Sequence, residues 1–266
     1  MNRQHSEDPF LGPAAPDLGW VPAPRYLMRR ARLRPLLAAL SPGTLLEIGP
    51  GAGALLIEAG RRGFQCEALE SSREAREIAA AMIADHGLAI PVHASPGDWA
   101  ARFDTLCAFE VLEHIEHDRE ALRQWREWLR PGGVLLLSVP AKMRLWTARD
   151  EWAGHFRRYE RQPLLQLMRD AGYAVEHFEC YGFPLANLSE RLSASSYERL
   201  MRGTGGATDR RSQTDRSGVD RGPQFKIYPL VKSTPGKLSL RLFSAVQAAF
   251  IHTDLGSGYL LKARRT

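Results

Sequence analysis

Short apolar runs alternate with longer helical patterns over most of this chain. The expected strands cover residues 44–48, 64–69, 90–94, 103–109, 134–139 and 174–181, and the expected helices between them cover 52–62, 72–86, 118–129 and a segment ending at 171. Strands that alternate with helices build a parallel sheet with helices on both faces. The alternation therefore predicts an α/β, doubly wound fold with a core over residues 44–184.

Three segments lie outside this alternation. Residues 1–43 are expected to form a loosely structured, proline-rich lead-in and then a helix over 26–40, kinked or restarted at Pro35. Residues 185–257 are expected to be an insertion that caps a substrate pocket, and 258–266 supply the last core strand. Within the insertion, residues 202–224 have almost no apolar content, which predicts flexibility. An apolar helix over 238–251 is either buried or part of a lipid-facing surface.

The composition narrows the class of protein. The net charge of +6 suits anionic partners such as phosphates, nucleic acid or lipid headgroups, although a solvated basic surface explains it equally well. Cys66, Cys107 and Cys180 have neither metal-ligand nor redox spacing, which indicates reduced core thiols. The first residues lack a signal peptide and no apolar run is long enough to span a membrane, so we expect a cytoplasmic protein.

The most specific local pattern is Glu-Ile-Gly-Pro-Gly-Ala-Gly at residues 47–53, where the first strand turns into a helix. Glycines at such a turn let the backbone bend and let a cofactor approach closely. The pattern also fits the dinucleotide-binding fingerprint, and Glu70 after the next strand can hold a ribose of either cofactor class. The glycine loop alone leaves both classes open.

Two features favour S-adenosylmethionine (SAM). The carboxylate of Glu47 can face the cationic amino acid end of SAM, whereas negative charge is unfavourable beside a pyrophosphate. Asp98 and Trp99, after the third strand, offer an acceptor for the adenine amino group and a ring that covers the base.

Residues 44–140 resemble the core of the class I SAM-dependent methyltransferases, especially the branch with the ubiquinone-biosynthesis O-methyltransferases. The matching motifs are 47–53, Glu70, Gly97-Asp98, Phe-Glu-Val-Leu-Glu-His at 109–114, and Leu-Arg-Pro-Gly-Gly at 129–133. The resemblance implies a Rossmann-like, seven-stranded sheet with an antiparallel last strand. It also implies that SAM is the cofactor, with Gly49, Gly51 and Gly53 beneath it, Glu70 at the ribose and Asp98 at the adenine. The full predicted binding set is Glu47, Gly49, Gly51, Gly53, Glu70, Ser71, Asp98, Trp99, Phe109 and Glu110.

The acceptor is expected at the carboxyl ends of the strands, where ligands of such sheets bind. Methyl transfer requires alignment and a dry site, and a base only when the acceptor must lose a proton. His114 is the leading base candidate because histidine titrates near neutrality, and a structural role is its alternative. His155 and Tyr159, in the basic and aromatic loop over 141–161, are the other catalytic candidates.

Glu110, Glu113 and His114 also share one face of a helical turn, as a metal-binding trio would. The spacing resembles the metal-binding segment of small-RNA terminal 2′-O-methyltransferases, in which a further histidine lies downstream, as His155 does here. Similar segments occur in metal-independent relatives, so the prediction includes no metal.

The sequence thus predicts a SAM-dependent methyltransferase that methylates an oxygen of a small-molecule or lipid-linked acceptor. An anionic acceptor is one form of this prediction. An RNA acceptor, a nicotinamide-dependent oxidoreductase and a SAM-binding subunit without chemistry are the alternatives. The oligomeric state and the acceptor do not follow from the sequence.

Overall fold

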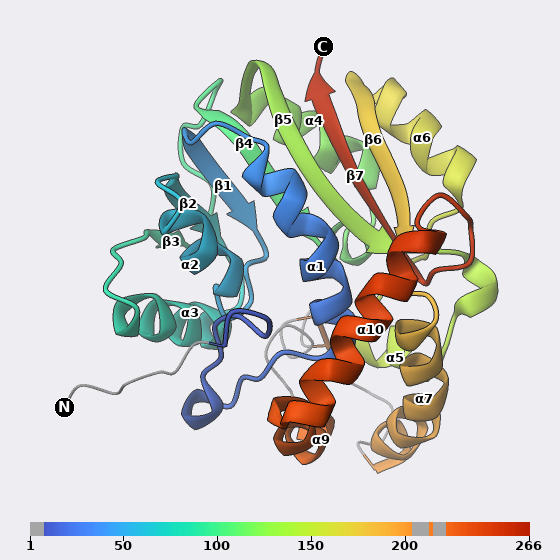
Figure 1. Ribbon diagram of the computed structural model, residues 1–266. Coiled ribbons are helices and arrows are strands. Elements are labelled where there is room, and N and C mark those ends of the chain that lie inside the picture. The colour runs from blue at the N-terminus through green and yellow to red at the C-terminus, as the bar shows by residue number, and fades with distance from the viewer. Residues whose placement is uncertain (1–7, 204–212, 215–221) are drawn as a thin grey trace.

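The computed structural model describes residues 8–203, 213–214 and 222–266, which surround a central seven-stranded sheet (Figure 1). The strands are β1 (Thr44–Ile48), β2 (Gln65–Leu69), β3 (Val92–His93), β4 (Phe103–Phe109), β5 (Leu129–Pro140), β6 (Tyr173–Tyr181) and β7 (Gly258–Arg265). Their order is β3-β2-β1-β4-β5-β7-β6, and β7 runs antiparallel to both β5 and β6. The predicted α/β sheet with an antiparallel last strand is confirmed.

Helices cover both faces of the sheet because successive strand side chains point to opposite sides. The helices of the first face are α1 (Pro24–Ala38), α2 (Ala54–Gly60) and α3 (Arg73–Asp85), and those of the second are α4 (Asp118–Trp128) and α6 (Arg161–Asp170). Leu45 of β1 packs with the first group of helices, whereas its neighbour Leu46 packs with the second. Burial on both faces explains why these strands read as nearly continuous apolar runs.

Several element boundaries differ from the prediction. The turn expected before strand five lies inside β5, because Phe103 pairs with Leu129 and Thr105 pairs with Val134, so that the intervening residues bulge outward. At the sheet edge, β3 is only two residues long. The expected loop over 141–161 contains a 3-10 turn, η3 (Met143–Leu145), and helix α5 (Ala148–Ala153).

The lead-in is more ordered than predicted. Leu11, Trp20 and Val21 are buried, and Asp8 accepts hydrogen bonds from the backbone of the next turn. Burial of these apolar side chains offsets the entropy cost of ordering the segment. Helix α1 then continues through Pro35 without interruption.

The insertion between β6 and β7 contains α7 (Leu185–Gly203), α9 (Gly222–Lys232) and α10 (Thr234–Phe250). In Figure 1, α7, α9 and part of α10 lie beyond the end of the sheet at which β1 terminates. Most of the stretch predicted to be flexible, 202–224, falls outside the described residues. Within the described part of the chain, no helix combines the length and the apolar character needed to cross a membrane.

Candidate active site

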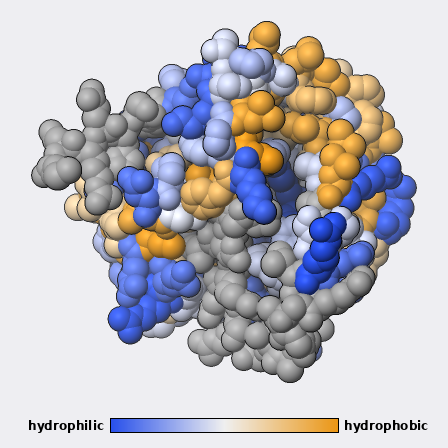
Figure 2. Space-filling view, turned by 90° about the horizontal axis from the view of Figure 1, so that it is seen from below, coloured by the Kyte–Doolittle hydropathy of each residue, from blue (hydrophilic) through white to orange (hydrophobic). Residues whose placement is uncertain are grey.

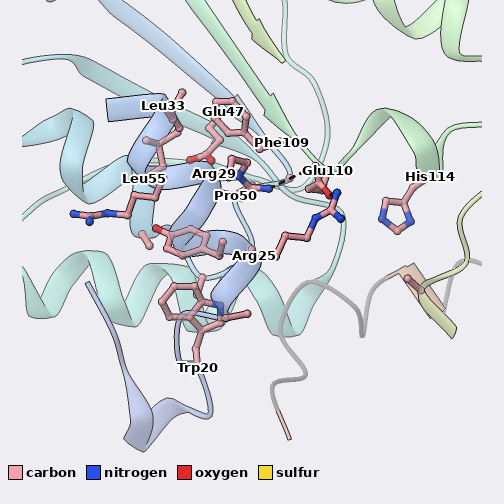
Figure 3. A pocket seen from close by; sticks show the side chains of 18 of the residues that line it. Trp20, Arg25, Arg29, Leu33, Glu47, Pro50, Leu55, Phe109, Glu110 and His114 are labelled. Carbon is pink, nitrogen blue, oxygen red and sulfur yellow. Dashed lines mark ion pairs between the residues drawn. The ribbon is translucent and has the colours of Figure 1, made fainter. Parts of the chain in front are cut away.

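The candidate site lies where β1 and β4 are neighbours, the point at which the strand order of the sheet reverses. Ligands of open α/β sheets bind in the crevice outside the strand ends at such a point. A cavity of about 160 Å³ occupies this crevice, between α1, the glycine loop, the end of β4 and the segment around α5 (Figure 3). Of the predicted residues, the cavity brings together Glu47, Gly49, Gly51, Phe109, Glu110, His114 and His155.

The glycine loop requires glycine for conformational and steric reasons. Gly49, Gly51 and Gly53 have φ angles of 63°, 55° and 78°, in the region that side chains other than glycine rarely adopt. A Cβ on Gly49 would also lie 2.6 Å from the side chain of Val111. Glu70 accepts a hydrogen bond from the backbone N–H of Gly51 at 3.4 Å and thereby ties the loop to the end of β2.

Glu47 is a buried carboxyl group with a free oxygen. It is 4% exposed, and among the described residues its Oε2 atom has no hydrogen-bond partner. Burial raises the pKa of Glu47 to about 8, and Arg29 only partly opposes this shift. A buried carboxyl group that lacks a partner at a cavity wall fits the cationic amino group of SAM.

Two arginines of α1, which the sequence prediction missed, also reach into the cavity (Figure 3). Arg25 pairs with Glu110 at 2.7 Å and with Glu190 of α7, and Arg29 lies 3.9 Å from Glu110 and over the ring of Phe109. Burial alone would raise the pKa of Glu110, but the two arginines lower it to about 2. Their spacing of four residues places both on one face of a helix, and this spacing could have indicated in the sequence that they act together.

The cavity into which these arginines reach is small. Binding sites for small molecules commonly measure about 300–1,000 Å³, and the cavity of about 160 Å³ is well below that range. The cavity is therefore too small to enclose a whole SAM molecule while Arg25 and Arg29 point into it. Guanidinium groups that turn away from Glu110 can bind a carboxylate of a ligand.

The other predicted SAM residues lie outside the cavity. Glu70 is half-buried, and Ser71 and Asp98 are exposed beyond the ends of β2 and β3. Trp99 is different, because its ring is buried and packs edge to face against Phe103 and Trp128 of the core and against the half-buried ring of His93. The structure thus does not bring Trp99 to an open surface where it could cover a base.

The two histidines expected to be catalytic lie in contact. The ring centroids of His114 and His155 are 4.6 Å apart, with the rings almost perpendicular. Asp150 Oδ1 lies 2.9 Å from His155 Nδ1, and a carboxylate can only accept, so Nδ1 carries the proton and Nε2 has the lone pair. Arg158 donates to both oxygens of Asp150 at 2.8 Å. Burial lowers the pKa of both histidines, to about 3 for His114.

Glu113 completes this cluster. Its carboxyl group is fully buried, neither oxygen has a hydrogen-bond partner among the described residues, and Oε1 lies 3.9 Å from His155 Nε2. Burial, followed by the charge of Glu110, raises the pKa of Glu113 well above its usual range. The donor atoms of Glu113, His114 and His155 lie within 4.8 Å of one another, a set that suits a divalent cation. Glu110, which the sequence pattern grouped with them, instead pairs with Arg25.

Tyr159 does not line the cavity. Its hydroxyl group is buried and donates to Asp118 at 3.0 Å and to the backbone carbonyl of Leu112 at 3.3 Å, which holds the turn after β4 in place. Burial raises the pKa of Tyr159 far above that of a base useful at neutral pH. The neighbouring Arg157 and Arg158 are likewise engaged, by Asp118 and Asp150 respectively.

Comparison with known proteins identifies the family. Residues 23–178 match the family described as a methyltransferase domain. The chain is 35% identical over 101 residues to the ubiquinone biosynthesis O-methyltransferase of Caulobacter vibrioides, a match that covers 36% of this chain and 40% of that protein. It is 34% identical over 100 residues to the protein of the same name from Caulobacter sp., with the same two coverages of 36% and 40%. The chain therefore spans about two fifths of the length of these relatives.

Solved structures share the fold over most of both chains. A SAM-dependent methyltransferase from Mesorhizobium loti aligns with a TM-score of 0.51 at 17% identity and covers 91% of this chain and 98% of its own. A geranyl diphosphate methyltransferase, solved with GPP and sinefungin, aligns with a TM-score of 0.53 at 16% identity and covers 90% and 78%. The family match, which takes in the glycine loop and extends over more than half of the chain, decides between the two cofactor classes. The chain belongs to the class I SAM-dependent methyltransferases, and SAM is its cofactor.

Proposed function

We propose that this chain transfers the methyl group of SAM to an oxygen atom of a small-molecule or lipid-linked acceptor. The observation that carries the proposal is that Glu47, with its free carboxyl oxygen, and His155, with its Asp150 partner, border one cavity. The relatives from Caulobacter are named as O-methyltransferases of ubiquinone biosynthesis, which supports oxygen as the methylated atom.

The cofactor end of the cavity is built by residues of the first half of the chain. SAM supplies a methyl group on a positively charged sulfur, which departs as a neutral thioether. Glu47 accepts hydrogen bonds from the amino group, and Arg29, once turned away from Glu110, binds the carboxylate. The backbone of Gly49 and Gly51 forms the floor of this part of the site.

The remaining cofactor contacts are assigned to the nucleoside. Glu70 accepts from the ribose hydroxyl groups and Asp98 accepts from the adenine amino group, with Ser71 beside them. Gly53 is the N-cap of helix α2 beneath the same ligand, and Phe109 and Glu110 border the methyl group. Trp99 is left out of the set because its ring packs in the core.

On the acceptor side, the geometry favours His155 over His114 as the base. Asp150 holds His155 in the tautomer whose Nε2 atom is free to take a proton from an acceptor hydroxyl group. No carboxylate among the described residues pairs with His114, and its pKa of about 3 makes it a poor base. Its ring, packed against His155, limits access of water to the reacting atoms.

The test is methyl transfer from labelled SAM to phenolic and quinol acceptors, with the methylated atom identified by mass spectrometry. The His155→Ala variant is expected to lower turnover about 100-fold while SAM affinity changes little, because His155 lies at the acceptor end. His252→Ala is the matched control, since His252 is exposed and lies outside the cavity, and it is expected to retain activity. Equal turnover of His155→Ala and the wild type at saturating acceptor would remove His155 from the mechanism.

A second arrangement of the acceptor side is favoured by the two unpartnered oxygens of Glu113. Glu113, His114 and His155 would hold a divalent cation, which would lower the pKa of an acceptor hydroxyl group. Titration of the protein with Mg²⁺ or Zn²⁺ by calorimetry, without substrate, tests this arrangement. Binding that Glu113→Gln abolishes would support it, and absence of binding to the wild type would reject it.

A further inference from the structure

Helix α10 is anchored to the body of the protein by its inner face. Gln247 is buried, donates to the backbone carbonyl of Met28 in α1 at 3.1 Å and accepts from the N–H of Gly182 at 2.7 Å. Leu240 packs beside it with Leu27 and Met28 of α1. The helix is therefore fixed in orientation, one helix away from the cavity that α1 lines.

A second apolar face of this helix points away from the protein. Leu238 and Leu242 are 66% and 63% exposed, and Ala245 and Ala249 continue the same face as exposed residues. Helix α9 packs against the start of α10 and exposes Ile227 and, to 67%, Leu230. Figure 2 shows hydrophobic side chains gathered on the part of the molecule that carries these helices. We call Ile227, Leu230, Leu238 and Leu242 with their basic neighbours the α9–α10 surface.

The two helices that carry these apolar residues bear charges of a single sign. Residues 222–250 contain Lys226, Lys232, Lys237 and Arg241 and no aspartate or glutamate. Lys237 pairs with Asp8 at 2.9 Å, whereas no carboxylate among the described residues pairs with the other three. An apolar stripe with a basic rim is typical of helices that lie in the interface of an anionic bilayer.

The same charges argue against a second copy of the chain as the occupant. A symmetric dimer would place this surface against itself and would bring the cations of both copies into one interface. Like charges brought together in an interface weaken binding, whereas anionic headgroups complement them. Apolar exposure of this kind in a monomer marks an interaction site.

From this geometry we propose that the α9–α10 surface docks the chain onto an anionic phospholipid bilayer. The leucines enter the boundary between headgroups and acyl chains, and the lysines and arginine contact the phosphates. The contact is interfacial and spans nothing, and it goes beyond the proposed function without depending on it. It would bring α1 and the adjoining cavity close to a pool of apolar acceptors.

The experiment is flotation of the full chain with vesicles of phosphatidylcholine alone or mixed with phosphatidylglycerol. The wild type is expected to bind the mixed vesicles, to bind neutral vesicles much more weakly, and to be released by salt. Lys226→Gln with Lys232→Gln is expected to weaken binding about 25-fold, at about five-fold for each charge. Leu238→Ser with Leu242→Ser is expected to weaken it at least about ten-fold.

Controls keep the outcomes distinct. Arg62→Gln with Arg123→Gln removes the same charge from exposed positions on other elements and is expected to bind vesicles normally. Because the substituted residues are exposed, thermal stability and SAM affinity are expected to match the wild type, so a failure here does not touch the proposed function. The proposal would be overturned if the wild-type protein does not bind anionic vesicles, or if the leucine variants bind them as strongly as the wild type. A dimer that the leucine variants dissociate, without vesicle binding, would also overturn it in favour of a second copy.

Discussion

Replacing Glu47 by glutamine is expected to change the stability of the SAM-free protein and its affinity for SAM in opposite directions. The side chain keeps its size, but the buried carboxyl group, whose Oε2 atom has no partner among the described residues, is replaced by an amide that does not titrate. We expect the variant to lose a pH-dependent penalty on folding and at the same time to bind SAM more weakly. Side chains that bind a ligand commonly lower the stability of the ligand-free protein in this way.

The magnitude follows from the two pKa values. Burial raises the pKa of Glu47 from 4.5 to about 8, so near neutrality the folded chain holds a proton that the unfolded chain has released. The contribution of Glu47 to the free energy of unfolding is therefore fully present below pH 4.5, where the group is protonated in both states. It is lost progressively as the pH rises through 8. At about 1.4 kcal/mol for each pH unit, the loss between pH 4.5 and pH 7 is about 3 kcal/mol. The glutamine side chain does not titrate, so the Glu47→Gln variant does not show this loss of stability.

Urea unfolding between pH 5 and pH 8 measures this difference as the change in the free energy of unfolding with pH. The wild type is expected to lose stability relative to Glu47→Gln across this range. Calorimetry with SAM in buffers of different ionisation enthalpy is expected to detect proton release by the wild type only, and an affinity about 10- to 100-fold lower in the variant. Equal pH slopes together with equal SAM affinities would refute the role given to Glu47.

Three further predictions concern the loop, the histidine pair and acid conditions. Gly51→Leu places a side chain at a φ of 55° on the floor of the cavity and is expected to abolish SAM binding; unchanged affinity by calorimetry would refute the placement. Asp150→Asn is expected to lower turnover about 100-fold or more, because His155 is no longer held in one tautomer. It is also expected to lower the free energy of unfolding by about 3 kcal/mol, because Arg158 stays buried without full charge compensation. A variant whose pH–rate profile equals that of the wild type would contradict this. Because burial holds the pKa of His114 and His155 below 6.5, the unfolded chain takes up these protons first, and the contribution of the two histidines to stability is expected to fall as the pH drops below 6.5, opposite to the trend of Glu47. His114→Gln should make this decline shallower in acid denaturation, and an unchanged decline would count against it.

The fold was predictable because local patterns and tertiary structure agree in the first two thirds of the chain. Strands β1 and β4 begin and end at the predicted residues, since each is a buried run bounded by turn residues. The antiparallel direction of β7 came from the family resemblance, and the strand order was not predicted, because no local pattern specifies which strands pair. The ordered lead-in was missed because its few apolar residues, such as Trp20, show no periodicity.

The candidate site was predictable only in part. Glu47 and the glycines are contiguous in sequence, so their proximity follows from one turn. Arg25 and Arg29 are distant from that turn, and only the packing of α1 places them beside Glu110. Trp99 and Tyr159 were assigned to the site from residue type, but their rings fill the core, which is the commoner position for aromatic side chains beside strand ends.

The central claim is that the turn after β1 binds the amino acid end of SAM. A crystal structure of the chain with SAM or S-adenosylhomocysteine tests it most directly. The account predicts the nucleoside in the crevice between β1 and β4, the ligand amino group within about 3 Å of Glu47, and Arg25 and Arg29 turned away from Glu110. Ligand density elsewhere on the chain, or a ligand bound there with Glu47 facing no polar group, would contradict it.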